Sequence, residues 1–399
     1  MIKLCVRNFG PITNGYIDDE FLDITKLTLF IGNQGTGKST IAKLFSTFSW
    51  IEKKLFIENS IEILIPTSTF IDRLKFHKID GFLKKESKLD YIGEFARIRY
   101  EDGDISGEIL NPYAYIRPKI QYIPAERNLV GVVDKYGQIP YLSDSLQDFM
   151  YTYDVAVQSD FVQNLQLPIN ELKIKYNRQN HKVELFNSEY SIFLDEASSG
   201  LQSFVPLFIV QKFLTDELSQ THKRIVFKNV DERKRLEALY KKNLGYLPNS
   251  DFELEQYVKE NANILLNSCL VSILEEPEQN LFPASQKNII FDLLSNLNLS
   301  DNNKMLITTH SPYLLPYINA AIKANEMIKQ NQKAKTKIEK IIPAQTFMES
   351  DSVHVYEFEN GTIKTLGKIK NISSDNNLLN QELEETNEFF RSILKAGIA

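Results

Sequence analysis

Residues 32–39 read Gly-Asn-Gln-Gly-Thr-Gly-Lys-Ser and lie between an apolar run, residues 27–31, and a segment, residues 40–48, that is predicted to be helical. Glycines at this spacing let consecutive backbone N–H groups turn inward, and a helix N-terminus favours anions. Lys38 supplies a charge for the outer phosphates, and the Ser39 hydroxyl can ligate Mg²⁺. The segment is therefore predicted to be a phosphate loop that binds a nucleoside triphosphate and Mg²⁺. Its other expected binding positions are Asn33, Gly35, Thr36, Gly37 and Thr40.

Length and composition limit the class of protein. A chain of 399 residues is long enough for one large α/β domain with insertions, or for two or three smaller domains. Charged residues at 25% and hydrophobic residues at 43% are ordinary globular values, which argues against a disordered or fibrous chain. The net charge of −6 argues against a uniformly basic nucleic-acid binder, although it leaves room for a local basic patch.

Cysteine usage and hydropathy bear on the compartment. Cys5 and Cys269 are far apart and lack metal-ligand spacing, which fits a reducing compartment. The first residues do not follow a signal-peptide pattern, and no apolar run approaches the ~20 residues of a membrane span. We therefore expect a cytoplasmic protein that is not embedded in a membrane.

Several alternating segments predict strands and hairpins. Residues 2–6 alternate as a strand should, and residues 172–185 contain a pair of alternating runs. The pairs at 95–109 and 353–366 each surround an Asp-Gly or Asn-Gly turn, the strongest short hairpin signal. These segments predict an antiparallel sheet beside the nucleotide site and a hairpin near the end of the chain.

The same reading predicts a domain organisation. Residues 1–345 are expected to form one head with inserted segments at about 51–120 and 215–262. Residues 346–399 are expected to add a hairpin and a helix that can dock a partner. The second insertion mixes basic and acidic residues, so it is either a DNA-facing arm or a solvated helical face. No heptad pattern is sustained over several turns, which argues against a long coiled-coil arm.

Two carboxylates end an apolar strand at residues 270–276, Glu275 and Glu276. On a strand beside the phosphate loop, the first carboxylate can hold the Mg²⁺ shell, and the second can orient and deprotonate the attacking water. A pair of surface acids is the alternative. It is disfavoured because acids at the end of a buried strand need partners.

Another short apolar segment, residues 304–309, is followed by His310. A lone histidine is more often a packed or surface residue than a functional one. After a core strand of a nucleotide-binding sheet, however, its imidazole can hydrogen-bond the γ-phosphate. We therefore count His310 with Glu276 as the expected catalytic pair.

Several motifs together resemble the ABC-type ATPases, from residue 2 to about residue 315. Within that family they resemble the soluble branch of overcoming-lysogenization-defect proteins and bacterial antiphage ATPase subunits, which is related to SMC and RecF heads. The motifs are Asn8–Ile12 (opening strand), Tyr122–Arg127 (central motif), Ser198–Ser203 (signature), Glu275–Glu278 with Leu281 and Pro283 (Walker B and D-loop) and Thr309–Pro312 (switch histidine).

The resemblance implies an α/β fold, an ABC-type ATPase head with a mixed central sheet, an antiparallel β subdomain and a helical insertion. It implies Mg²⁺-dependent ATP hydrolysis. It also implies a homodimer or higher homo-oligomer in which Ser198, Ser199 and Gly200 of one subunit contact the γ-phosphate held by another. From the residues alone, this turn is either an anion site at a helix N-terminus or an N-cap with nothing bound.

Two positions depart from the family pattern. Glu275 stands where most ABC enzymes have aspartate, and its extra methylene lengthens the reach by about 1.5 Å, so its metal contact can run through water. The usual lid glutamine is represented only by Gln121, which we include among the expected metal ligands with Ser39 and Glu275.

The residues favour a soluble ATPase over a transporter subunit, because the interval from Ser198 to Glu276 is far longer than one connecting helix of ~11 residues. No triad of metal-binding acids is evident after residue 315, so any nuclease is expected on a separate protein. By analogy with the family, the chain is expected to control a separate nuclease or toxin in antiphage defence. The alternative is a DNA-repair or chromosome-maintenance ATPase of the SMC or RecF type that clamps DNA in a basic groove.

Overall fold

A computed structural model describes residues 1–58, 60, 61, 67–111, 115–133, 135–223, 230–261, 265–366 and 388. Its centre is a seven-stranded sheet with the order β2-β16-β15-β4-β14-β13-β8. Neighbours from β15 to β8 pair in parallel and β15 pairs antiparallel with β16, which confirms the predicted mixed α/β fold. The strands are β2 (Gly15–Tyr16), β4 (Leu27–Gly32), β8 (Pro118–Ile123), β13 (Cys269–Glu275), β14 (Lys304–Thr309), β15 (Val353–Glu359) and β16 (Thr362–Thr365).

Both faces of the central sheet are covered, because its strands are apolar on both sides. In β4, Leu29 and Ile31 enter the hydrophobic core on one face, while Phe30 enters the core on the other. In β14, Ile307 and Leu306 divide in the same way. Successive side chains of a strand point to opposite faces, so a continuous apolar run requires a layer on each side.

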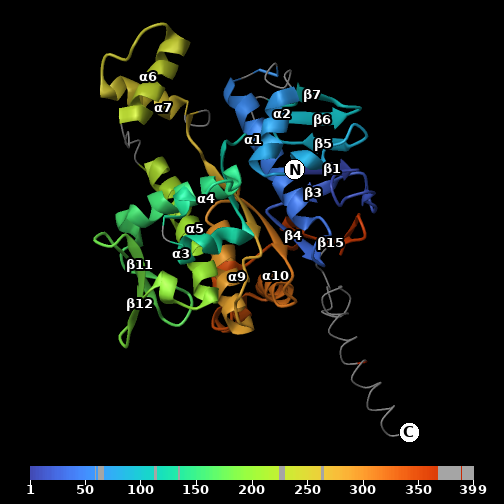
Figure 1. Ribbon diagram of the computed structural model, residues 1–399. Helices are drawn as coiled ribbons and strands as arrows, with labels where there is room; N and C mark the ends of the chain where they lie inside the picture. The colour runs from blue at the N-terminus through green and yellow to red at the C-terminus, as the bar shows by residue number, and fades with distance from the viewer. Residues whose placement is uncertain are drawn as a thin grey trace.

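One layer consists of α1, α2 and a five-stranded antiparallel sheet with the order β3-β1-β5-β6-β7 (Figure 1). The hairpin expected at 95–109 forms β6 and β7, and Asp102 and Gly103 in its turn have positive φ. The elements are α1 (Lys38–Glu58), α2 (Thr67–Phe76), β1 (Ile2–Arg7), β3 (Leu22–Ile24), β5 (Lys88–Ile92), β6 (Ala96–Glu101) and β7 (Asp104–Ile109).

The opposite layer consists of helices and a second antiparallel sheet with the order β12-β11-β10-β9. The pair expected at 172–185 belongs to this sheet. The two antiparallel pairs expected from the sequence, β6–β7 and β10–β11, thus lie in two different sheets. The elements are α3 (Leu129–Val132), α4 (Asp144–Gln158), β9 (Leu165–Gln166), β10 (Lys173–Asn177), β11 (Lys182–Phe186), β12 (Ser191–Phe193), α5 (Ser199–Lys223), α9 (Pro283–Leu297) and α10 (Leu314–Gln330).

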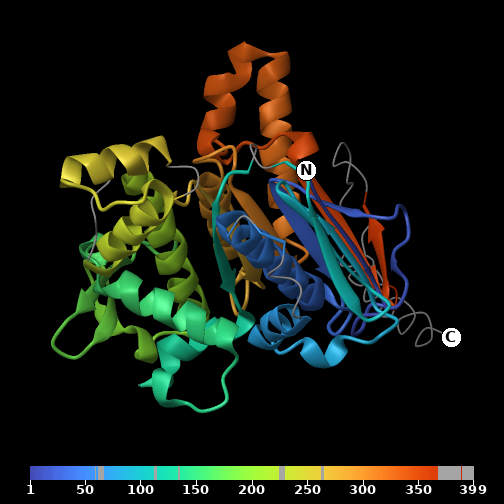
Figure 2. The ribbon, with the colours of Figure 1, turned by 90° about the horizontal axis from the view of Figure 1, so that it is seen from above.

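The expected helical insertion contains α6 (Val230–Leu244) and α7 (Asp251–Glu260). The two helices have a small core of their own, made by Leu236, Tyr240, Leu254, Tyr257 and Val258. Figures 1 and 2 show them at one end of the molecule, on the side away from the five-stranded sheet. Short helices complete the fold: η2 (Asp80–Phe82), η3 (Ala125–Asn128), η4 (Tyr136–Gln138), η5 (Asp160–Val162), η6 (Leu194–Glu196), η7 (Gln332–Ala334), α11 (Lys335–Glu339), η8 (Ala344–Thr346) and η9 (Ser350–Ser352).

Two segments differ from the sequence reading. The helix after the phosphate loop runs from Lys38 to Glu58 rather than ending near residue 48, so the segment expected as an insertion begins inside it. The hairpin of β15 and β16 is part of the central sheet, because β15 pairs with β4. The helix expected after this hairpin lies outside the described residues, apart from residue 388. Among the described residues, no helix is long and apolar enough to cross a membrane.

Candidate functional site

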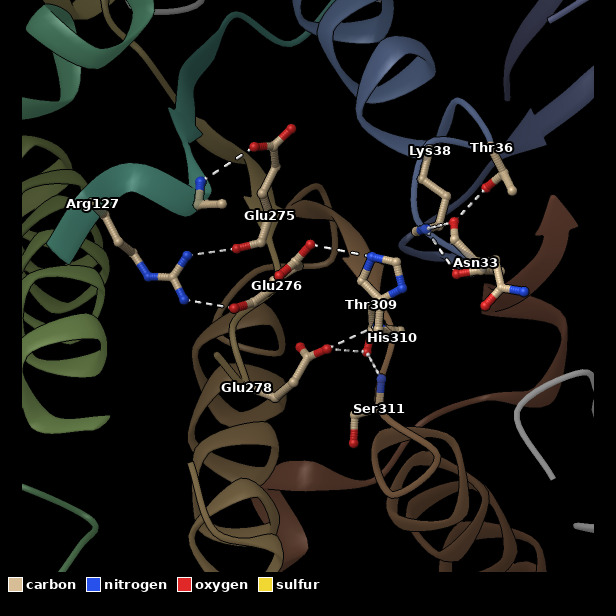
Figure 3. A network of polar contacts seen from close by, with 12 residues as sticks. Asn33, Thr36, Lys38, Arg127, Glu275, Glu276, Glu278, Thr309, His310 and Ser311 are labelled. Carbon is tan, nitrogen blue, oxygen red and sulfur yellow. Dashed lines mark hydrogen bonds and ion pairs between the residues drawn. The ribbon is translucent and has the colours of Figure 1, made fainter. Parts of the chain in front are cut away.

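Four neighbouring parallel strands end at one edge of the central sheet, and this edge collects the residues predicted for the site. Leu274 of β13 pairs with Ile123 of β8, and Thr309 of β14 pairs with Ile31 of β4. The segments that follow these strands therefore lie side by side, where open α/β sheets bind ligands. Figure 3 shows the phosphate loop, the histidine, the two acids and Arg127 in that order along the edge.

The phosphate loop needs its glycines for steric reasons. Gly32 has a φ of 137°, and a Cβ on it would lie 2.3 Å from the carbonyl oxygen of Phe358 in β15. Gly37 has a φ of 102°, and a Cβ on it would lie 2.5 Å from Cδ1 of Ile12. Such close approaches exclude a side chain. The loop is thus held between the N-terminal turn and β15, and its backbone N–H groups precede the first turn of α1.

Lys38 lies over this loop. Its Nζ donates to the carbonyls of Gly32, at 2.8 Å, and Asn33, at 2.7 Å. Burial lowers its pKa to about 8, and the nearby acids, Glu276 first among them, partly oppose the shift. The hydroxyl of Thr36 donates to the same Asn33 carbonyl at 2.8 Å. A phosphate would offer the ammonium a charged partner in place of two neutral carbonyls.

The rest of the loop agrees with a triphosphate site. Asn33 and Gly35 are exposed, Ser39 is half-buried and Thr40 is buried in the first turn of α1. An exposed, glycine-bent loop opening a 21-residue helix is a suitable anion cradle. The described residues contain no group of three or more His, Cys, Asp and Glu side chains that could hold a metal. Mg²⁺ usually keeps several waters and is held by one or two protein oxygens and the substrate phosphates, and Ser39 and one carboxylate could supply those oxygens here.

Glu275 is held by two internal donors. The Tyr122 hydroxyl donates to Oε1 at 2.5 Å, and the Ala125 N–H donates to Oε2 at 3.2 Å. Its side chain thus joins the end of β13 to the end of β8. Because both oxygens already accept hydrogen bonds and the residue is 4% exposed, this arrangement favours an indirect contribution to the metal site over direct ligation.

The Glu276 side chain points toward His310 at the strand edge (Figure 3). Its Oε1 lies 3.2 Å from Nε2 of His310, and both side chains are half-buried. This hydrogen bond lowers the pKa of the Glu276 carboxyl, with smaller contributions from the charges of Lys38 and Arg127. Glu276 has a φ of 43°, a left-handed conformation that is costly for a residue with a side chain.

Arg127 holds that conformation in place. It is fully buried, and its Nη1 and Nη2 each donate over 2.6 Å to the carbonyls of Glu275 and Glu276. Its Nε donates to the carbonyl of Ser203 in α5 at 2.9 Å. Burial lowers the pKa of Arg127 to about 10, so the group stays charged at neutral pH. One guanidinium therefore joins the acidic turn to the helix that follows the signature.

Glu278 holds the segment Thr309–His310 through hydrogen bonds. Its Oε1 accepts from the Thr309 hydroxyl at 2.6 Å and from the His310 N–H at 3.0 Å, while its buried Oε2 has no hydrogen-bond partner. Burial raises the pKa of this carboxyl. These bonds fix the backbone from which the His310 imidazole extends toward Glu276.

The signature turn lies at the start of α5. Ser198 and Ser199 are exposed, and the carbonyl of Ser198 accepts the first helical hydrogen bond, from the N–H of Gln202. Gly200 is buried, and a Cβ on it would lie 2.7 Å from the carbonyl oxygen of Asn280 in the segment after the acids. No hydrogen bond or ion pair among the described residues links this turn to the chain's own phosphate loop. The two serines therefore remain accessible to another molecule.

The sequence reading expected Gln121 at the metal site, and it assigned no role to three residues that contribute to the site. Gln121 is fully buried in β8, where its Oε1 accepts from Thr152 and its Nε2 donates to the Tyr122 carbonyl. The structure does not bring it to the strand edge and lends no support to a metal role. Sequence reasoning included Arg127, Tyr122 and Glu278 only as members of motifs and assigned them no role of their own. Arg127 lies four residues beyond the end of β8, within η3, so its place in the Tyr122–Arg127 motif is the signal that could have singled it out.

No protein-family profile and no curated protein matches the chain. Among solved structures, the chain is similar to an SMC head bound to the C-terminal winged-helix domain of ScpA, at 13% identity and a TM-score of 0.37 over 91% of this chain and 96% of that one. It is similar to the SMC head of Thermotoga maritima, at 9% identity and a TM-score of 0.39 over 91% and 97%. An ATP-binding cassette in a dimeric state with ADP and Pi matches at 10% identity and a TM-score of 0.32 over 93% and 100%.

Proposed function

We propose that the chain is a Mg²⁺-dependent, ATP-hydrolysing head of the ABC type. The observation that carries this proposal is the single strand edge at which the phosphate loop, His310, Glu276 and the Arg127 clamp meet. Each of these is a part that phosphoryl transfer to water requires, namely a phosphate cradle, a group that orients water and a rigid support.

In this proposal the N-terminus of α1 and the loop N–H groups bind the triphosphate, and Lys38 moves from the Gly32 and Asn33 carbonyls to the outer phosphate oxygens. Ser39 and one carboxylate hold Mg²⁺, which when bound neutralises charge on the phosphate oxygens. Glu276 is ionised at neutral pH, and the carboxylate oxygen that does not bond His310 can accept a proton from water. His310 orients that carboxylate, and because β14 pairs with β4, the strand before the phosphate loop, its ring can reach a γ-phosphate bound there.

A second copy of the chain is proposed to complete the site. Exposed Ser198 and Ser199 at the start of a 25-residue helix offer hydroxyl and N–H donors to a γ-phosphate held by a facing subunit. The same helix is bonded through the Ser203 carbonyl to Arg127, and so to the Glu276 carbonyl. Closure of the two subunits on ATP would therefore act on Glu276, the proposed base, through the side chain of Arg127.

The Glu276→Gln variant tests this function. It keeps the shape of the side chain but removes its basicity, so ATP should still bind while turnover falls by ~100-fold or more. Light scattering with ATP should then show a dimer or larger assembly of this variant. Turnover close to that of the unaltered chain would mean that another group acts on water, and the proposed role of Glu276 would be abandoned.

The biological role is a further part of the proposal. We propose a cytoplasmic ATPase that controls a separate nuclease or toxin in antiphage defence, which is supported by the motif resemblance. The alternative is a DNA-clamping repair or chromosome-maintenance ATPase. It predicts that the purified protein binds DNA with an affinity that falls steeply with salt. Co-purification of the chain with the products of neighbouring genes, weighed with and without ATP, separates the two.

A further inference from the structure

A cavity with a volume of about 510 Å³ lies between α1, α2, α4 and β8. Its walls include Ser46, Trp50 and Lys54 from α1, Arg73 from α2, and Lys119 and Tyr122 from β8. It shares no residue with the phosphate loop. Trp50 follows Lys38 by about 18 Å along the helix axis, at 1.5 Å per residue. The cavity is therefore distinct from the proposed ATP site, and its size lies in the range of ~300–1,000 Å³ typical of small-molecule sites.

The charge of this cavity is opposite to that of the chain. Four cationic side chains, Lys53, Lys54, Arg73 and Lys119, face two acids, Glu58 and Asp148, whereas the whole chain has a net charge of −6. In the part of the chain that the structure describes, Lys54, Arg73 and Lys119 form no ion pair. The charge of Asp148 acts on Arg73 and Lys119, although no close ion pair forms, and four cations against two acids leave the cavity with a positive balance that attracts anions.

Arg73 is arranged for an anion. Its guanidinium carbon lies 3.6 Å from the ring centroid of Phe76 and 4.7 Å from that of Trp50, so two rings hold it in place. Its Nε is buried and has no hydrogen-bond partner. Burial lowers the pKa of Arg73 to about 10, which still leaves it charged at neutral pH. A guanidinium fixed in this way at the wall of a cavity is well suited to a phosphate oxygen.

A second polar group in the same cavity also lacks a partner. Ser46 is 1% exposed, and its buried Oγ makes no hydrogen bond. Buried polar groups are almost always satisfied, so an unpaired hydroxyl on a residue of the cavity wall points to a ligand or ordered water nearby. The remaining wall is apolar, since Trp50, Ile57 and Ile120 contribute to it.

We propose that this cavity binds a nucleoside phosphate, with the phosphate at Arg73 and Lys119 and the base against Trp50, Ile57 and Ile120. Cationic side chains and an aromatic ring on one hollow are the combination that recognises both parts of a nucleotide. The site is separate from the phosphate loop, so the proposal does not depend on ATP hydrolysis.

The cavity also adjoins the strand edge of the ATP site. Tyr122 lines the cavity and is 3% exposed, and its hydroxyl donates to Glu275. A ligand that packs against the Tyr122 ring affects the position of its hydroxyl, and through this hydroxyl the position of the Glu275 carboxylate at the end of β13. Occupation of the cavity is therefore expected to change the rate of ATP hydrolysis as well.

Trp50 is the only tryptophan of the chain, so intrinsic fluorescence reports directly on the cavity. The full chain carrying Lys38→Ala, which disables the phosphate loop, is titrated with AMP, inorganic phosphate and a short single-stranded DNA. We expect saturable quenching by AMP, weaker binding of inorganic phosphate and no response to DNA. Adding Arg73→Gln should weaken AMP binding by roughly tenfold or more. Arg178→Gln, which removes the same charge from an exposed loop, should leave it unchanged.

Several outcomes would overturn the proposal. Absence of saturable quenching at millimolar AMP would remove the site, and an unchanged affinity in Arg73→Gln would place binding elsewhere. Equal affinity for inorganic phosphate and AMP would remove the nucleoside, while a response to DNA alone would indicate a nucleic-acid surface. If Arg73→Gln does not fold, as judged by circular dichroism, Lys119→Gln takes its place with the same expectation. A failure of ATP hydrolysis would not affect any of these readouts.

Discussion

The guanidinium of Arg127 donates from Nη2 to the main-chain carbonyl of Glu276 over 2.6 Å, and so holds a glutamate in a left-handed backbone conformation at the end of β13. Strained residues persist only where their surroundings over-determine them. Here the support comes from a fully buried cation that also bonds the Ser203 carbonyl of α5. The position of the proposed base is thus set by a residue outside the acidic motif.

Replacing Arg127 by Lys keeps the positive charge but removes the planar fork. Because several buried carbonyls then lose their donors, we expect the free energy of unfolding to fall by about 2–4 kcal/mol. ATP hydrolysis should fall more than ATP affinity, since the phosphate loop is untouched. Urea unfolding and calorimetric ATP titration measure the two effects. Equal losses of affinity and turnover would argue against a specific action on Glu276.

The hydrogen bond from His310 predicts a pH effect on Glu276. It lowers the carboxyl pKa below the ordinary value of 4.5, so its stabilising contribution is present above that value and is lost as the pH falls through the lowered pKa. In His310→Ala, the pKa should return upward. The acidic limb of the pH–rate profile of ATP hydrolysis should therefore move to higher pH. An unmoved limb would show that it belongs to another group.

Lys38 predicts an effect at alkaline pH. Its pKa of about 8 means that the free protein loses this charge as the pH rises through 8, whereas bound phosphate favours the charged form. ATP affinity should therefore fall above pH 8, and binding there should take up a proton. Since the unfolded chain binds this proton up to about pH 10.4, the same group makes folding more favourable as the pH rises from 8. Calorimetry in buffers of different ionisation enthalpy measures the uptake, which Lys38→Met should lack.

The signature turn predicts a defect in assembly without a defect in folding. Ser198 is exposed, so Ser198→Arg should fold normally but block the approach of a facing nucleotide by its size. In the Glu276→Gln background, ATP-dependent dimerisation should be lost. Ser188→Arg, at another exposed serine, serves as the matched control. Light scattering measures both, and an intact dimer of Ser198→Arg would contradict the shared site.

Tyr122 predicts a coupling between the acids and the neighbouring cavity. Tyr122→Phe keeps the ring but removes the hydroxyl that donates to Glu275, which should cost about 1–3 kcal/mol of stability. Turnover should fall because the end of β13 is less firmly held. AMP binding at the cavity should persist, but its effect on ATP hydrolysis should weaken. If AMP changes the rate of ATP hydrolysis as much in Tyr122→Phe as in the unaltered chain, another contact couples the two sites.

The sequence by itself determined the local elements of this protein. The phosphate loop, the apolar strands ending in Glu275 and His310, and the hairpin turns at Asp102-Gly103 and Asn360-Gly361 were all predictable. Each depends on short-range chemistry: a left-handed turn favours glycine, asparagine or aspartate, and a strand buried on both faces needs a continuous apolar run.

Only the tertiary structure decided which of these elements meet. The strand order β4-β14-β13-β8 is set by pairing across long stretches of chain, and it alone brings His310 within 3.2 Å of Glu276. It buries Gln121, a plausible ligand by sequence, against Thr152. It also makes Arg127 a clamp, because its partners are backbone carbonyls, which every residue has and which no sequence pattern marks.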